Sequence, residues 1–206
     1  MNKINYQKKL DEIILNIEKT GIKPSLLMHC CCAPCSSYCL EYLNKYFDIT
    51  VLYYNPNISP FEEYEHRKSE LRRFIDEKFE KDEIKSIDCD WENDKFLSSI
   101  KGLEKEKEGG KRCKVCFTLR LEKAAKVAAE NNFDYFVTTL SISPLKDANL
   151  LNEIGIELSE KYNVKYLPSD FKKKEGYKRS LILSKDYNLY RQNFCGCVFS
   201  SQTKLI

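Results

Sequence analysis

The stretch SLLMHCCCAPCS, Ser25–Ser36, decides the fold of this chain. Its first half, Ser25–Cys30, is a short apolar run that predicts a buried strand. Ser36–Phe47 then returns to helical spacing, and Pro34 suits the start of a helix because its missing N–H would be unpaired there. A strand therefore leads into a helix through a turn that holds three cysteines, Cys31, Cys32 and Cys35.

The alternation of strand and helix continues along the chain. Further strands are predicted from short runs of β-branched and aromatic residues at Ile49–Tyr54, Ile84–Ile87, Tyr135–Leu140 and Val164–Leu167. Further helices are predicted from apolar residues at helical spacing at Tyr6–Lys19, Glu62–Lys78, Glu92–Gly102, Cys113–Asn131, Ala148–Tyr162 and Gly176–Tyr187. This order predicts a single-domain α/β fold, a parallel sheet with helices on both faces. We expect residues 1–24 to form an N-terminal helical extension to a domain that spans residues 25–206.

Composition places the chain in a reducing compartment without a membrane partner. It has 206 residues, 42% hydrophobic and 32% charged, and no apolar run of about 18 residues that would span a bilayer. Its charged, amphipathic start does not resemble a signal peptide. We therefore expect a cytoplasmic protein, in which clustered cysteines act as metal ligands or catalytic thiols rather than disulfides. The net charge of +3 does not by itself indicate nucleic acid, although basic residues concentrate in Lys101–Lys114 and Phe171–Lys185.

Seven of the ten cysteines lie in three tight clusters. These candidate metal ligands are Cys31, Cys32, Cys35, Cys113, Cys116, Cys195 and Cys197. A structural zinc site or a cubane iron–sulfur cluster takes four protein ligands, so one closed site leaves three thiols over. Either a second metal lies beside the first, or some of the thiols are redox-active. Cys39 and Cys89 are interpreted as packing residues, and so is Cys30, whose side chain should point to the sheet face opposite Cys31.

The polar motifs follow the predicted strands at the edge where parallel sheets bind ligands. The cysteine turn follows the first strand, Asn55-Pro56-Asn57 the second, and Ser141–Pro144 the fourth. The sequence therefore predicts a metal site at the C-terminal ends of the strands. His29 shares the face of Cys31 and is either a hydrogen-bonded core histidine or a proton donor beside the metal.

Several separated motifs resemble, in their order, those of the QueH-type epoxyqueuosine reductases. They are His29-x-Cys-Cys-Ala-Pro-Cys35, Tyr54-Asn-Pro-Asn57, Arg112-Cys-x-x-Cys116, Thr138-Thr-Leu-x-Ile-Ser-Pro144 and Tyr190-Arg-Gln-x-x-Cys-Gly-Cys197. The likeness runs from about Leu26 to Ser200. It implies a Rossmann-like fold of the HUP type, related to the PP-loop enzymes that modify tRNA. A glycine-rich phosphate loop is absent at the first strand–helix turn, so ATP use is not expected.

The resemblance also implies an activity and its cofactors. Such an enzyme reduces epoxyqueuosine to queuosine at the wobble position of tRNA, the last step of queuosine biosynthesis, without cobalamin. It is similar to enzymes that hold a [4Fe–4S] cluster with an additional mononuclear iron beside it, which agrees with the surplus of thiols. Its partners would be a tRNA anticodon loop carrying epoxyqueuosine and an unidentified low-potential electron donor.

Two departures from the family pattern concern the ligands. Cys30 gives three consecutive cysteines where the family usually has two, and Cys35 stands where some relatives have a carboxylate. Cys35 is therefore a candidate ligand of the single iron. We assign Cys113 and Cys116, with two of the other five clustered cysteines, to the cubane cluster, and the rest to the second iron.

The remaining candidate residues lie at strand ends or just before Cys195. Those for a catalytic role are His29, Tyr54 and Lys146. Those for binding the nucleoside or RNA are Asn57, Thr139, Ser143, Lys146, Tyr190 and Arg191. Two alternatives are a zinc-binding RNA module, in which the cysteines only hold loops together, and a PP-loop sulfur-transferring enzyme, which would need ATP.

Overall fold

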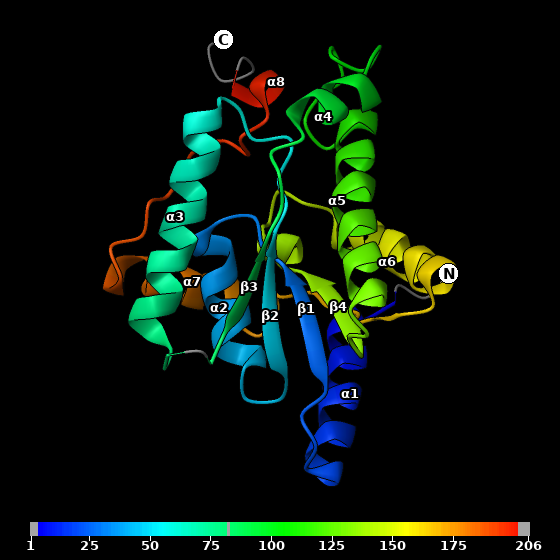
Figure 1. Ribbon diagram of the computed structural model, residues 1–206, viewed down its shortest axis with the longest axis vertical. Coiled ribbons are helices and arrows are strands. Elements are labelled where there is room, and N and C mark those ends of the chain that lie inside the picture. Colours follow the sequence, from blue (N-terminus) through cyan, green and yellow to red (C-terminus); the bar gives the residue numbers. More distant parts are fainter. Residues whose placement is uncertain (1–3, 82, 202–206) are drawn as a thin grey trace.

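The fold is that of a computed structural model, which describes residues 4–81 and 83–201. Its centre is a five-stranded sheet in which every strand pair is parallel (Figure 1). The strands are β1 Ser25–His29, β2 Asp48–Tyr53, β3 Lys85–Asp88, β4 Tyr135–Thr138 and β5 Lys165–Tyr166. Their order across the sheet is β3-β2-β1-β4-β5, the order of doubly wound Rossmann-type sheets. The predicted α/β class and parallel sheet are confirmed.

Helices cover both faces of the sheet. They are α1 Tyr6–Thr20, α2 Ala33–Leu43, α3 Phe61–Lys78, α4 Asn93–Ser99, α5 Lys111–Glu130, α6 Ala148–Tyr162, α7 Gly176–Asp186 and α8 Val198–Ser201. On one face α1, α2 and α3 pack on strand residues such as Met28 and Val51. On the other face α5 and α6 pack on Leu27 and Phe136 (Figure 1). Because successive strand residues point to opposite faces, one strand contributes to both cores.

Most element boundaries differ from the predicted ones by one to four residues, and the shifts at α2 and β4 bear on the site. Helix α2 begins at Ala33 instead of Ser36, with Cys32 as its extended N-cap residue. It ends at Leu43, where the chain turns and Phe47 N–H donates to the Leu43 carbonyl at 3.0 Å. Strand β4 ends at Thr138 rather than Leu140, because the Thr138 hydroxyl accepts the Leu140 N–H at 3.2 Å. That bond turns the chain into a short 3₁₀ helix, η1, over Thr139–Ile142.

The first helix belongs to the main core. Leu10 and Ile14 of α1 are buried in the same apolar cluster as α2. The helix ends at Gly21, whose φ of 67° is the left-handed conformation that glycine adopts readily. Nothing in the described part of the chain is a helix both long and apolar enough to span a bilayer. Residues 1–3 of the predicted extension and residues 202–206 of the predicted domain lie outside the described residues.

Candidate metal centre

The candidate site lies where the strand order reverses. Strand β1 pairs with β2 on one side and with β4 on the other, so the connections after β1 and after β4 run in opposite directions across the sheet. In such sheets this reversal opens a crevice at the carboxyl ends of the strands. The cysteine turn after β1 and the η1 turn after β4 meet there, and the Sγ of Cys31 lies 3.8 Å from the Thr139 hydroxyl. The cysteine turn and the η1 turn therefore lie together at the carboxyl ends of the strands, where the sequence predicted the site.

The first thiol group consists of Cys31, Cys32 and Cys35. Their sulfur atoms all lie within 4.8 Å of one another, and within residues 4–81 and 83–201 no other cluster of three or more potential metal ligands is this compact. Hydrogen bonds from Cys32 and Cys35 lower the pKa of Cys31 well below its ordinary value. The N-terminus of α2 adds the positive end of a helix dipole, which favours thiolates. The group is suited to a soft metal.

The second thiol group consists of Cys113, Cys116, Cys195 and Cys197. The first two lie on the opening turn of α5 and the other two on the segment before α8. All four line a cavity of about 130 Å³, called here the smaller cavity. Hydrogen bonding from Cys197, with help from Ser200, lowers the pKa of Cys195 to about 5. Burial raises the pKa of Cys116 to about 11, and the charge of Arg120 is the strongest opposing influence.

Backbone geometry holds the second group in place. The N–H of Gly109 donates to Cys113 Sγ at 3.2 Å. Between the two C-terminal cysteines, Gly196 has φ of 96°, and a Cβ there would lie 2.8 Å from Ile58 Cγ1. The Gly196 carbonyl accepts the N–H of Ser59 at 3.0 Å. Only glycine therefore fits the turn that aims Cys195 and Cys197 at α5.

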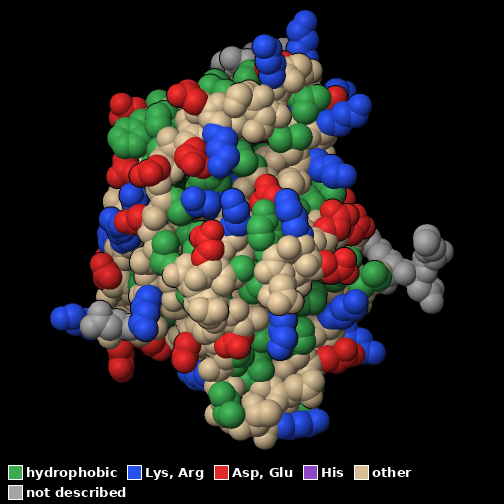
Figure 2. Space-filling model, turned by 45° about the vertical axis from the view of Figure 1, so that its right-hand side comes forward, with side chains coloured by type: hydrophobic (Ala, Val, Ile, Leu, Met, Phe, Trp, Pro, Cys, Tyr) green, Lys and Arg blue, Asp and Glu red, His purple; other side chains and the backbone are tan. Residues whose placement is uncertain are grey.

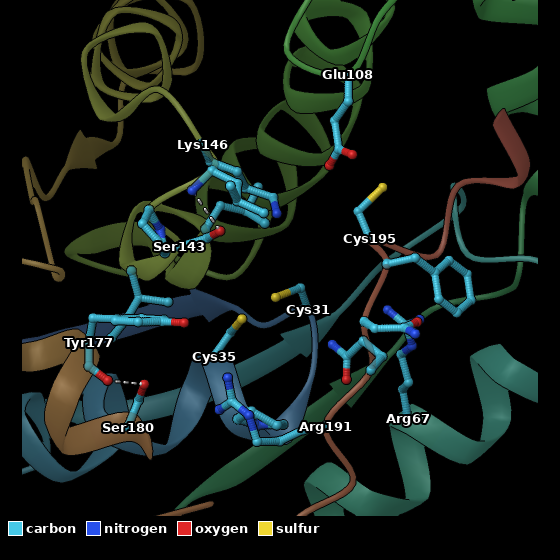
Figure 3. A pocket seen from close by; sticks show the side chains of 18 of the residues that line it. Cys31, Cys35, Arg67, Glu108, Ser143, Lys146, Tyr177, Ser180, Arg191 and Cys195 are labelled. Carbon is cyan, nitrogen blue, oxygen red and sulfur yellow. Dashed lines mark hydrogen bonds between the residues drawn. The ribbon is translucent and has the colours of Figure 1, made fainter. Parts of the chain in front are cut away.

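The two thiol groups share one cleft. A larger cavity of about 320 Å³ is lined by Cys31, Cys35 and Cys195. The larger and smaller cavities have five lining residues in common, Glu108, Arg120, Leu145, Lys146 and Cys195. Figure 3 shows the sulfurs of Cys31, Cys35 and Cys195 around this space, with Glu108 and Lys146 directed toward it. Six of the seven clustered thiols line these cavities, and the sulfur of the seventh, Cys32, lies within 4.8 Å of those of Cys31 and Cys35. This donor set fits thiolate-bound iron or zinc.

Two basic side chains, Arg120 and Lys146, lie beside the thiols in the cleft. Arg120 is 3% exposed and lines both cavities. Lys146 lines both as well, and although burial acts to lower its pKa, thiolates at Cys35, Cys31 and Cys195 raise it. The thiolates therefore favour the protonated form of the Lys146 amine. Arg120 lies four residues after Cys116 and seven after Cys113, the spacing of one helix face, and that signal in the sequence could have identified it.

His29 is held as a neutral core histidine. It is fully buried, and burial followed by the charge of Arg120 lowers its pKa to about 3. Its Nε2 lies 3.0 Å from the Tyr54 carbonyl, which can only accept, so Nε2 carries the hydrogen. Nδ1 then accepts from the Thr138 hydroxyl at 2.9 Å. The ring therefore ties the ends of β1, β2 and β4 together, and it lines neither cavity.

The other sequence-predicted residues divide into two sets. Those that line one or both cavities are Asn57, Ser143, Lys146 and Arg191. Thr139, Tyr54 and Tyr190 line neither, although Thr139 contacts Cys31. The Tyr54 hydroxyl donates to Glu92 at 2.5 Å, and the Tyr190 hydroxyl lies 3.2 Å from both carboxylate oxygens of Glu63. The sequence analysis missed Arg67, Glu108, Arg120, Tyr177 and Ser180, which also line the cleft.

The packing prediction for the three other cysteines is confirmed. Cys30 is fully buried in the core on the α2 face, whereas Cys31 packs against the core on the α5 face, as the alternation along β1 requires. Cys39 is also fully buried, and its Sγ lies 3.4 Å from the Cys35 carbonyl. Cys89 is partly buried against the core on the α5 face.

The fold and the clustered thiols at its switch point define the class: a parallel, Rossmann-like α/β protein with a candidate thiolate metal site. Comparison with known proteins identifies the family within this class. The family described as "Epoxyqueuosine reductase QueH" matches residues 26–203. The chain belongs to this family, and the resemblance seen in the sequence is confirmed.

Individual relatives cover most of both chains. An epoxyqueuosine reductase QueH of Staphylococcus epidermidis is 47% identical over 97% of this chain and 85% of that protein. The protein of the same name from Streptococcus pyogenes is 44% identical over 97% of this chain and 79% of its own length. One from Thermotoga maritima is 34% identical over 85% of this chain and 90% of its own length.

Proposed function

We propose that this protein reduces epoxyqueuosine to queuosine at the wobble position of tRNA, as the last step of queuosine biosynthesis and without cobalamin. The observation that carries the proposal is the group of seven clustered thiols, six of them lining the cleft, at the switch point of a chain that belongs to the QueH family. Residues 25–206 form the reductase domain in this proposal, and residues 1–24 are a helical extension. The protein acts in the cytoplasm, where its thiols stay reduced.

The cleft is proposed to hold a [4Fe–4S] cluster and an additional mononuclear iron. Cys113 and Cys116 bind the cluster with two of the other five clustered thiols, and the rest bind the single iron or cycle as redox-active thiols. Four ligands are what a cubane needs, and the surplus supports a second site. When bound, these groups supply single electrons and a Lewis acid for the epoxide oxygen.

The chain's own residues supply positioning and protons. Converting the epoxide to an alkene and water consumes two electrons and two protons. Lys146 is a protonated amine that lines both cavities, which supports it as the source of a proton. Asn57 and Ser143 add polar groups at the strand ends, and Thr139 contacts Cys31. His29 is proposed as a positioning residue, because its neutral ring already hydrogen-bonds to Thr138 and Tyr54.

The substrate reaches the thiols as an unstacked nucleotide. A base in a folded anticodon loop must be splayed out before it reaches thiols that are buried or partly buried, and single-stranded loops permit this at low cost. Arg191 lines the larger cavity, and Tyr190 precedes it on the same segment. On the face shown in Figure 2, lysine and arginine side chains are interspersed with acidic ones, which favours local phosphate contacts over one broad basic surface. A low-potential donor supplies the electrons.

The test is a conversion assay under anaerobic conditions. Protein reconstituted with iron and sulfide receives epoxyqueuosine-containing tRNA and a low-potential reductant, without cobalamin or ATP. Nucleoside analysis should show queuosine replacing epoxyqueuosine. Metal-replete protein that binds the tRNA and leaves the epoxide intact would contradict the proposal and favour a zinc-binding RNA module. Conversion only on addition of ATP would favour a PP-loop enzyme.

A further inference from the structure

Arg120 is a buried cation that forms no ion pair with a carboxylate within the described part of the chain, and its charge acts on the thiols of Cys31 and Cys116 instead. Its side chain is 3% exposed and lies on α5, one turn after Cys116. Nη2 donates to Asn55 Oδ1 at 2.5 Å, and Nε lies 3.4 Å from His29 Nε2. Both of these neighbours are neutral. An unpaired buried charge is strongly unfavourable, so this position calls for a negative group in the cleft.

The two other buried arginines are compensated by the fold itself. Arg67 is 2% exposed and pairs with the Glu63 carboxylate at 2.7 Å. Arg112 is 2% exposed and donates to the main-chain carbonyls of Glu104 and Glu106 at 2.8 and 2.5 Å. Arg120 differs from both because it lines the two cavities at once, whereas Arg67 lines only the larger and Arg112 only the smaller.

Thiols approach Arg120 from both groups. It lines the larger cavity with Cys31, Cys35 and Cys195. It lines the smaller cavity with all four members of the second thiol group. A charge fixed at this place acts on an anion in either cavity, whichever thiols bind which metal.

We propose that Arg120 is the fixed counter-cation of the thiolate-bound metal group and raises its reduction potential. The inference rests on the proposed iron–sulfur function. A thiolate-ligated cluster is an anion, and each added electron makes it more negative, so a neighbouring positive charge stabilises the reduced form. A guanidinium stays protonated in proteins, so the effect does not depend on pH. Arg120 acts through the metal group and is a positioning residue.

The test is a redox titration of reconstituted protein, followed by absorbance and electron paramagnetic resonance. Arg120→Gln removes the charge and keeps a hydrogen-bond donor, whereas Arg120→Lys keeps the charge. Lys126→Gln removes an exposed charge from the same helix and serves as the control. We expect a more negative midpoint potential in Arg120→Gln, a value near that of the parent in Arg120→Lys, and no change in Lys126→Gln. Equal potentials in the parent and Arg120→Gln, or equal shifts in both Arg120 variants, would overturn the inference.

If Arg120→Gln does not retain the cluster, the iron and sulfide contents of the variants are compared instead. Retention in Arg120→Lys with loss in Arg120→Gln, while circular dichroism shows both folded, supports a role of the charge. Equal loss in both variants would show that the shape and hydrogen bonds of arginine matter instead. A parent protein that holds zinc and no sulfide contradicts the proposed function and the inference together. A parent with a cluster whose potential is insensitive to Arg120 contradicts the inference alone.

Discussion

The two thiol groups are built in different ways. Cys31 and Cys32 come from the turn after β1, and Cys35 from the first turn of α2, at the centre of the sheet. The second group combines the start of α5 with a C-terminal segment about 80 residues later in the sequence. The first group therefore depends on local geometry that forms with the sheet, and the second on contacts made across the fold. Substitutions can separate the two.

The largest expected effect is loss of the cluster from the second group. We expect Cys113→Ser to abolish the absorbance of the reconstituted cluster and to lower turnover by at least about 100-fold. Loss of a residue that only supports a metal ligand lowers activity by up to about 100-fold, and loss of a ligand should lower it at least as much. Cys116→Ser should behave alike. Cys39→Ser and Cys89→Ser are the controls and should keep the spectrum, because neither residue lines the cavities. Bleaching in Cys89→Ser with retention in Cys113→Ser would reverse the assignment.

A second substitution perturbs only the C-terminal half of the second group. Gly196→Ala places a Cβ 2.8 Å from Ile58 Cγ1 at a φ of 96°. We expect a loss of about 1–3 kcal/mol in the free energy of unfolding, with less iron per chain. Gly102→Ala is the matched control, because its φ is 86° and its Cβ meets no atom within 4 Å. It should show backbone strain alone and keep its iron. Equal iron content in the two variants would mean that Cys195 and Cys197 do not bind metal.

The salt dependence of RNA binding tests the rim of the larger cavity. Affinity for the anticodon stem-loop should fall as salt rises, because phosphate contacts release counterions. Arg191 lines this cavity on the C-terminal segment, and its Nη1 donates to Ser184 at 3.0 Å. Arg191→Gln should reduce the slope of log affinity against log salt by about one. An unchanged slope would remove Arg191 from the RNA contacts.

The smallest expected effect concerns the attachment of the C-terminal segment to α3. Tyr190→Phe removes the contact of its hydroxyl with the Glu63 carboxylate, at a cost of about 1 kcal/mol in the free energy of unfolding. Tyr162→Phe removes a comparable bond to Glu122 on the far side of α5 and is the control. We expect similar stability losses, measured by chemical denaturation, and faster loss of iron to a chelator only in Tyr190→Phe. Equal rates would show that the segment does not depend on this bond.

The sequence predicted the fold and the first thiol group well, for physical reasons. Short apolar runs and helical spacing are local signals, and Cys31, Cys32 and Cys35 lie within one turn. The sequence did not predict that Tyr54 and Tyr190 lie outside the cleft. The Tyr54 hydroxyl contacts a carboxylate beside α4 and the Tyr190 hydroxyl one on α3, and only the assembled fold brings these groups together. The spacing of Arg120 from Cys113 and Cys116 placed it on their helix face, but the sequence did not show that this face is buried, and Arg120 was missed.

The most direct test of the central claim is elemental analysis of protein purified and reconstituted without oxygen. Iron, zinc and acid-labile sulfide are measured per chain. A cubane cluster with a second iron predicts more than about four irons with about four sulfides per chain. One zinc per chain with no sulfide would contradict the claim that these seven thiols hold an iron–sulfur centre.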